Sequence, residues 1–199
     1  MASPSHLFKF HMSEGGLRVP LIISGPGIKK GKNHNFAFVT DIAATLSDIV
    51  FDNVDERIIG KSLQNSLAGT EEKNYLDSDS VGLEVTGNSA LFKGDFKIVK
   101  NRPPNGSNQW ELFNLSEDPG ETINLATSMP NKLQELIKEY EAYAEENGVI
   151  ELPLDYEWAA EMTINTFKRN YLPLIWKAAF FIILALSFVV VLVRRWRNS

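Results

Sequence analysis

A single apolar run near the C-terminus limits what this chain can fold into. Residues 171–193 are almost all apolar, and Lys177 is the one charged residue among them. As a helix, this run would extend about 34 Å at roughly 1.5 Å per residue, enough to cross a hydrocarbon core of about 30 Å. Trp176 and Trp196 lie at its borders, where interfacial aromatic residues are common. We therefore expect a transmembrane helix over residues 171–193. The alternative, a buried core helix, is rarely apolar all round over this length.

Basic residues flank the apolar run on both sides and bear on its orientation. Three arginines lie within residues 194–199, after the run, while Lys168 and Arg169 precede it. Basic residues near the ends of a span favour the cytoplasmic side, and acidic residues count for little. We expect a single-pass membrane protein with a basic cytoplasmic tail at residues 194–199. Its globular part would then face the periplasm or the exterior, which requires an export signal upstream of residues 1–9, since these lack the apolar core of a signal peptide.

Composition excludes some partners for the rest of the chain. The protein has 199 residues and a formal net charge of −5, which permits one domain with an accessory segment. An acidic balance gives no support to nucleic-acid binding, which usually relies on a basic patch. The sequence contains no cysteine, so a disulfide framework is impossible.

The N-terminal part of the chain, residues 1–80, reads as pieces of an α/β domain. Residues 19–24 are apolar and largely β-branched, which predicts a buried strand. A second short strand is predicted over residues 36–39. Residues 41–51 follow as a helix, because apolar side chains recur along one face. These pieces are typical of the last βαβ-type elements of a larger α/β domain.

The following part, residues 81–152, has a β pattern and then one helix. Four short strands alternate with turn residues, and their short links favour antiparallel order. The strands are predicted over residues 81–86, 89–93, 96–100 and 110–114. An amphipathic helix is predicted to begin after Ser128 and to end at Asn147-Gly148, with its apolar stripe packed on the sheet. Residues 153–170 then form a juxtamembrane linker.

A glycine-rich, charged segment before the first predicted strand carries the strongest candidate for a site residue. Lys9 lies five residues before Glu14-Gly15-Gly16. The two glycines allow a sharp turn at φ values closed to other residues. Lys9 would then lie on a loop that leads into a core strand, a common place for a site residue. The alternative is an ordinary solvated lysine.

Five separate motifs occur in the order that the sulfatase family shows. They are Lys9 with Glu14-Gly-Gly-x-Arg18-Val-Pro20, then Gly25-Pro-Gly27, then Thr40-Asp41-Ile42-Ala-Ala-Thr45-Leu46, then Gly87-Asn-Ser-Ala90-Leu-Phe-Lys-Gly94-Asp95-Phe-Lys97, and finally Trp110-Glu-Leu-Phe-Asn-Leu-Ser-Glu-Asp118-Pro119-Gly-Glu121-Thr-Ile-Asn124-Leu125-Ala126. Over residues 7–152 the chain resembles the C-terminal portion of that family, and most closely its bacterial type I arylsulfatases. The resemblance implies an α/β fold of the alkaline-phosphatase and sulfatase kind. This chain would hold its C-terminal fragment: the end of a mixed α/β domain, a small four-stranded antiparallel sheet with one packed helix, and then the transmembrane helix.

The resemblance also implies a reaction, the hydrolysis of sulfate monoesters. The nucleophile of sulfatases is a formylglycine made in a Cys/Ser-x-Pro-x-Arg motif. Ser128-Met-Pro130-Asn-Lys132 comes closest here, but lysine replaces the arginine and the site opens a predicted helix. Calcium, the cofactor that the family implies, would find no ligand set in this chain, because the family's metal-binding Asp-Asn pair lies further upstream. The family's general-acid histidine also lies further upstream.

Of the family's site residues, Lys9 is the one that this chain contains, and the resemblance predicts that it is both catalytic and substrate-binding. Its spacing to Glu14 matches that of the family's sulfate-contacting lysine, whose ammonium can donate hydrogen bonds to the sulfate oxygens. His11 lies two residues on, and we assign it no role. We expect Glu14 and Arg18 to hold the loop by ion pairing.

Two functions remain open. The first is the C-terminal part of a membrane-anchored sulfatase acting on a small-molecule sulfate ester, an aryl sulfate by resemblance, with the chain alone inactive. The second is a non-catalytic, membrane-tethered sulfatase-like module. In either case we expect an α/β part over residues 1–80, a sheet-and-helix subdomain over 81–152, a linker over 153–170, a span over 171–193 and a tail over 194–199.

Overall fold

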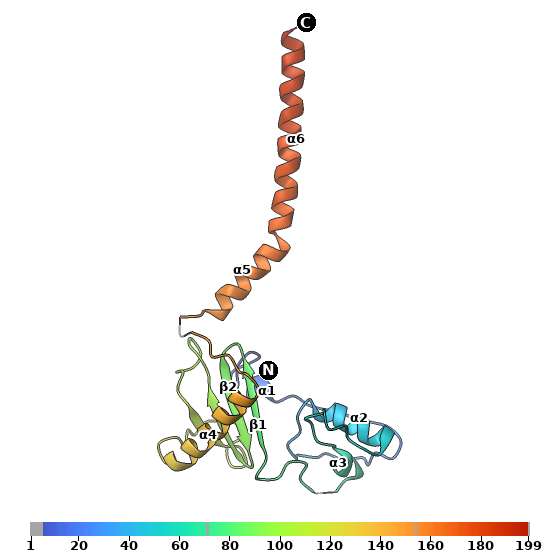
Figure 1. Ribbon diagram of the computed structural model, residues 1–199, viewed down its shortest axis with the longest axis vertical. Helices are drawn as coiled ribbons and strands as arrows, with labels where there is room; N and C mark the ends of the chain where they lie inside the picture. Colours follow the sequence, from blue (N-terminus) through green and yellow to red (C-terminus); the bar gives the residue numbers. More distant parts are fainter. Residues whose placement is uncertain (1–5, 71, 154, 199) are drawn as a thin grey trace. The chain divides into compact units, whose positions relative to one another are not determined.

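The computed structural model describes residues 6–70, 72–153 and 155–198. By its internal contacts the chain divides into two compact units, Met1–Glu151 and Leu152–Ser199 (Figure 1). The first unit contains the sheet together with helices α1 to α4, and the second contains helices α5 and α6.

A four-stranded antiparallel sheet forms the centre of the first unit, as predicted. Its strands follow one another in chain order, as β1 (Ser80–Val85), β2 (Asn88–Lys93), β3 (Phe96–Lys100) and β4 (Glu111–Asn114). Two-residue turns join the first three strands. Gly87 (φ 80°) and Gly94 (φ 56°) take the left-handed conformations that such turns require. These glycines therefore fix the register of β1, β2 and β3.

Helix α4 (Pro130–Glu146) covers one face of this sheet, which confirms the predicted packed helix. Its Leu136 and Tyr140 pack against a buried apolar layer contributed by the strands. That layer consists of Leu91, Ile98 and Leu112. The three strand residues are fully buried, so this face makes up the principal apolar core.

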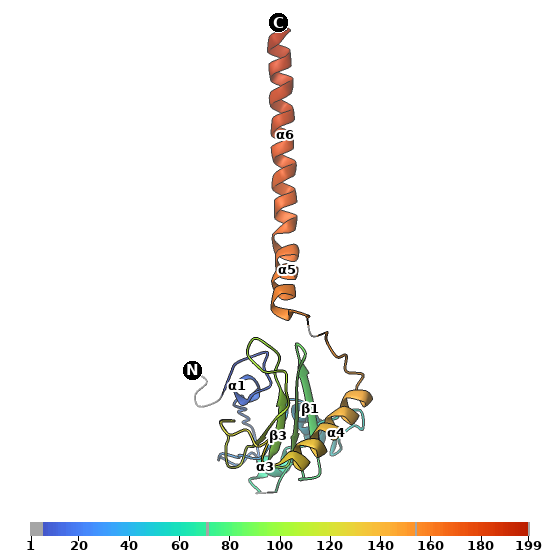
Figure 2. The same cartoon turned by 90° about the vertical axis from the view of Figure 1, so that its left-hand side faces the viewer.

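The opposite face of the sheet is covered by the N-terminal segment. Met12 is buried against Ala90, Val99 and Phe113. Helix α1 (Glu14–Leu17) follows directly, and in Figure 2 it and α4 lie on opposite sides of the strands. The segment that carries Lys9 is thus part of the fold of the sheet subdomain, although the sheet begins more than 60 residues later in the chain.

Two predicted strands are wrong for this structure. Residues 19–24 and 36–39 have no strand pairing, and Val19 and Ile22 are 78% and 90% exposed. A strand needs a neighbour to take up its backbone hydrogen bonds, and the described residues supply none to these two segments. In the described residues, the apolar side chains of Val19 and Ile22 are therefore left exposed, although their sequence is typical of a buried strand.

The predicted helix over residues 41–51 is confirmed as α2 (Asp41–Phe51), and a short α3 (Gln64–Ala68) follows it. The buried side of α2 carries Asp41, Ala44 and Thr45. Its larger apolar side chains remain exposed. They are Ile42, Leu46, Ile49, Val50 and Phe51.

The second unit consists of two successive helices. The segment predicted as a linker is largely helical, as α5 (Trp158–Asn170). All of the predicted transmembrane segment except Tyr171 lies within α6 (Leu172–Arg197). In the described part of the chain, residues Trp158–Arg197 contain one stretch long and apolar enough to cross a membrane, and none of its most apolar window is buried.

Candidate functional site

Lys9 lies on an exposed turn just before α1. Its side chain is accessible to solvent, and Nζ lies 5.4 Å from the centroid of the Phe10 ring. Leu7 and Phe10 have φ values of 60° and 76°, which are uncommon for residues with large side chains. Such a conformation persists only where surrounding contacts hold it.

Side chains of the sheet hold the backbone of this turn. The carbonyl oxygen of Phe10 accepts hydrogen bonds from Asn88 Nδ2 (2.6 Å) and Thr86 Oγ1 (3.2 Å). The amide of Met12 donates to Asn101 Oδ1 (2.9 Å). We refer to residues 7–13 as the Lys9 loop. The β1–β2 turn and the end of β3 thus fix its path.

Gly15 and Gly16 are required here for close packing and not for their φ values. Both lie in α1, and neither has a positive φ. A Cβ atom on Gly15 would lie 2.3 Å from the carbonyl oxygen of Leu7, and one on Gly16 would lie 2.2 Å from that of His11. The prediction that these glycines make a turn at unusual φ was therefore wrong, and their role is to let α1 pack against the Lys9 loop.

A buried group of three charged side chains fixes the C-terminal end of the loop. Lys97 Nζ lies 2.8 Å from Glu14 Oε1 and 2.8 Å from Glu121 Oε1. The exposed fractions of the three side chains are 0%, 7% and 2% for Lys97, Glu14 and Glu121. We call this group the buried triad. The expectation that Glu14 holds the loop by ion pairing is confirmed, and its partner is Lys97.

Further contacts of Lys97 and Glu121 help to offset the cost of burying the charges of the triad. Lys97 Nζ also lies 4.7 Å from the centroid of the Phe92 ring, a favourable place for a cation. The second oxygen of Glu121 accepts a hydrogen bond from the Glu14 amide (2.7 Å). Removal of the Lys97 ammonium would leave two buried carboxylates without a cation, which costs about 3–5 kcal/mol.

The three triad residues come from three different sequence motifs. Glu14 belongs to the Glu-Gly-Gly motif, Lys97 to the Gly-Asp-x-Lys motif, and Glu121 to the Asp-Pro-x-Glu motif. Sequence reasoning missed their association, because the pairs are 24 to 107 residues apart. One signal was present: strand alternation places Lys97 on the same face as Val99, where a buried lysine needs acidic partners.

His11 is a structural residue. It is 3% exposed, its Nδ1 lies 3.1 Å from the carbonyl oxygen of Phe8, and its Nε2 lies 3.1 Å from Asn105 Nδ2. Since a carbonyl only accepts and an amide nitrogen only donates, both contacts are satisfied by the neutral ring protonated on Nδ1. His11 therefore links the Lys9 loop to the β3–β4 connection.

A polar cavity of about 340 Å³ adjoins the Lys9 loop. Its lining includes His6, Ser13, Asn105 and Glu111. Burial raises the pKa of the Glu111 carboxyl. The charge of His6 opposes this shift, and the charge of Glu121 adds to it.

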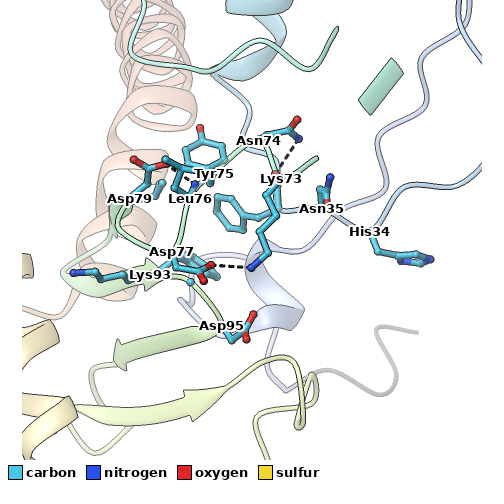
Figure 3. A pocket seen from close by; sticks show the side chains of 14 residues that line it. His34, Asn35, Lys73, Asn74, Tyr75, Leu76, Asp77, Asp79, Lys93 and Asp95 are labelled. Atoms are coloured by element: carbon cyan, nitrogen blue, oxygen red, sulfur yellow. Dashed lines mark hydrogen bonds and ion pairs between the residues drawn. The ribbon is translucent and has the colours of Figure 1, made fainter. Parts of the chain in front are cut away.

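A second, smaller cavity of about 150 Å³ lies between residues 34–36, residues 73–79 and the β2–β3 turn (Figure 3). Its charged side chains have partners within the protein. Lys73 Nζ lies 2.8 Å from Asp77 Oδ1, which raises the pKa of Lys73, and Lys93 is paired with Glu139 of α4. Both lysines that line this cavity are therefore neutralised by carboxylates of the protein.

The described ranges 6–70, 72–153 and 155–198 contain no group of three or more His, Asp or Glu side chains that could hold a metal ion. The fully buried carboxylate, Asp41, is occupied by protein donors: Phe38 N (2.6 Å), Lys61 N (2.8 Å) and Tyr75 Oη (2.6 Å). These residues do not fit the calcium that the resemblance implies, and we derive no step through calcium. Ser128, the nearest match to a nucleophile, lies just before α4 and donates to the carbonyl oxygen of Leu125 (3.1 Å).

Comparison with known proteins establishes the family. Residues 5–146 match the family model described as N-sulphoglucosamine sulphohydrolase, C-terminal, and the chain therefore belongs to the sulfatases, a family of sulfuric ester hydrolases. An uncharacterized sulfatase of Schizosaccharomyces pombe is 31% identical over 175 residues, covering 77% of this chain and 30% of that protein. Arylsulfatase K of Xenopus laevis is 28% identical, covering 66% and 26%. N-acetylgalactosamine-6-O-sulfatase of Bacteroides thetaiotaomicron is 26% identical, covering 64% and 27%.

A solved structure agrees with this assignment at the level of the fold. It comes from a study of the metabolism of multiple glycosaminoglycans by Bacteroides thetaiotaomicron, and it matches with a TM-score of 0.57 at 22% identity. The match covers 68% of this chain and 31% of that structure. It confirms the predicted sulfatase-like α/β fold. The chain thus spans less than a third of the length of each of these relatives.

Proposed function

We propose that this chain is the C-terminal part of a membrane-anchored sulfatase that hydrolyses sulfate monoesters, with Lys9 contacting the sulfate. The observation that carries the proposal is the arrangement of the Lys9 loop. An exposed lysine stands on a turn whose own backbone is held at unusual φ values by buried side chains of the sheet. Sites of this kind, where a loop is strained and strongly supported, are typical of functional residues.

The lysine has a definite chemical task in this reaction. Its ammonium group has three rotatable donors, and it can place them on the sulfate oxygens and on the leaving oxygen as negative charge develops there. The nucleophile, the metal ligands and the general acid would come from the part of the fold that this chain does not supply. The 199-residue chain alone is therefore expected to be inactive.

The substrate class follows by analogy with the relatives. One relative is named as an arylsulfatase and another as an N-acetylgalactosamine sulfatase. A small-molecule sulfate monoester is their shared chemistry, and an aryl sulfate is the simplest probe of it. We further propose that residues 1–80 complete the α/β domain, that residues 81–152 form the sheet-and-helix subdomain, and that residues 153–170 link it to the membrane.

Membrane anchoring is the second half of the proposal. Residues 172–193 lie in α6, whose large apolar side chains are exposed along its length. We propose that α6 crosses the membrane once, with residues 194–199 in the cytoplasm and the globular unit in the periplasm or exterior. A sulfate ester outside the cell could then reach Lys9.

The test of function combines the gene and the product. The frame upstream of Met1 should encode a Cys/Ser-x-Pro-x-Arg segment and an acidic metal-binding motif, and the full product should release sulfate from an aryl sulfate. The competing function, a non-catalytic tethered module, is supported if neither motif can be read in frame. Release of sulfate by the 199-residue chain with added calcium would show that the nucleophile has been misjudged.

A further inference from the structure

The buried triad has a structural effect beyond its contribution to stability. Burying a lysine with two carboxylates is rarely more stabilising than burying apolar side chains of similar volume, but it does favour one arrangement over others. The triad joins α1, β3 and the segment after β4, which are remote in sequence. Its effect on the structure is to fix where α1 and the preceding loop sit on the sheet.

The path from the triad to Lys9 is short and rigid. Glu14 is five residues from Lys9, and its amide and carboxylate are both bound, to Glu121 Oε2 and to Lys97 Nζ. Between them, Met12 is buried and hydrogen-bonded to Asn101. A shift of the triad would therefore be transmitted to the turn that carries Lys9.

The geometry at Glu121 requires a carboxylate of this length. One oxygen accepts from Lys97 Nζ and the other accepts from the Glu14 amide. A glutamine would present one NH₂ group to one of these two donors, and an aspartate would fall short by a methylene. Glu121 thus contributes to the placement of α1 as well as to the charge balance of the triad.

We propose that Lys97, together with Glu14 and Glu121, is a positioning residue for Lys9 in sulfate-ester hydrolysis. This rests on the proposed function of Lys9. A misplacement of about 1 Å by a remote change can reduce turnover by about 10²-fold. The triad would act through Lys9, since the exposed fractions of its own side chains are 7% or less.

A double-mutant cycle in the full-length sulfatase tests this. Lys97→Met and Glu121→Gln should each reduce kcat for an aryl sulfate by about 10²-fold. In a Lys9→Ala background, the same changes should have little further effect. Lys93→Met is the matched control, because it removes an ion pair to α4 on the opposite face of the sheet. It should leave kcat unchanged. Additive losses in the cycle, or equal losses in the control, would overturn the proposal.

Amide hydrogen exchange in the same proteins supplies a readout independent of activity. Lys97→Met and the milder Glu14→Gln should speed exchange of the amides of residues 8–14, while Lys93→Met should not. Glu14→Gln keeps a side-chain acceptor for Lys97, so it serves if Lys97→Met fails to fold. Unchanged exchange in Glu121→Gln, which loses the acceptor for one of its two donors, would contradict the positioning role. Faster exchange with no effect of Lys9→Ala on kcat would instead count against the function proposed for Lys9.

Discussion

At the scale of single residues, the position of a side chain matters more here than its identity. Lys9 and Lys97 are both lysines, yet one is exposed on a turn and the other is fully buried between two carboxylates. The sequence indicated Lys9 through its spacing to Glu14. It could not indicate the partners of Lys97, since these meet only when the N-terminal segment packs on the sheet. The site was therefore predictable in part, and its supporting contacts were not.

A pH-dependent effect is expected at Glu111. Burial raises the pKa of this carboxyl in the folded chain. A carboxyl with a raised folded pKa favours folding while it is protonated, and that contribution is lost as the pH rises through the folded pKa. Glu111→Gln should therefore raise the free energy of unfolding at pH 7, where the buried carboxylate is removed. At pH 3.5 the same substitution should raise it less. Urea unfolding of the full chain in detergent at both pH values measures this, and an identical difference at the two values would contradict it.

At the scale of elements, prediction succeeded where an element is completed by neighbours close in sequence. The antiparallel sheet and α4 pack against each other within about 70 residues, and both were predicted. The predicted strand over residues 19–24 failed because its partners are not supplied by the described chain. Amphipathic pattern alone specifies which side chains should be buried, and a strand also needs a hydrogen-bonded neighbour.

Ile22 gives a test of where that neighbour comes from. It is 90% exposed in this structure. In the 199-residue chain, Ile22→Ser should reduce aggregation and change unfolding little, because a solvated side chain is removed. In the full-length sulfatase, where we propose that residues 19–24 are a buried strand, the same change should cost about 2–5 kcal/mol. Ile59→Ser, at another exposed isoleucine, is the control in the short chain. A neutral effect of Ile22→Ser in the full-length protein would contradict the proposed strand.

At the scale of the whole molecule, the chain consists of two compact units that differ in kind. In the first unit, the Lys9 loop packs on a sheet whose two faces both carry buried apolar clusters. The second unit contains the one described helix that is apolar enough to cross a membrane. The sequence predicted the helix from its uninterrupted apolar run. Its orientation depends on a small difference in basic residues on the two sides.

A reporter fused after Ser199 in the full reading frame tests the orientation. We expect green fluorescence, because the arginine-rich tail should remain in the cytoplasm, where that reporter folds. Replacement of Arg194, Arg195 and Arg197 by alanine should weaken the preference. Alkaline phosphatase activity from a fusion at the same position, which requires export, would reverse the assignment.

Whether Lys9 contacts the sulfate in the transition state is measured by the turnover of Lys9→Ala in the full-length sulfatase. Loss of one transition-state donor lowers kcat by about 10²–10³-fold. Lys32→Ala, which removes another exposed loop lysine, is the matched control and should leave kcat unchanged. We predict a loss of this size for Lys9→Ala with an aryl sulfate; a kcat equal to that of Lys32→Ala would show that Lys9 is only a solvated loop residue.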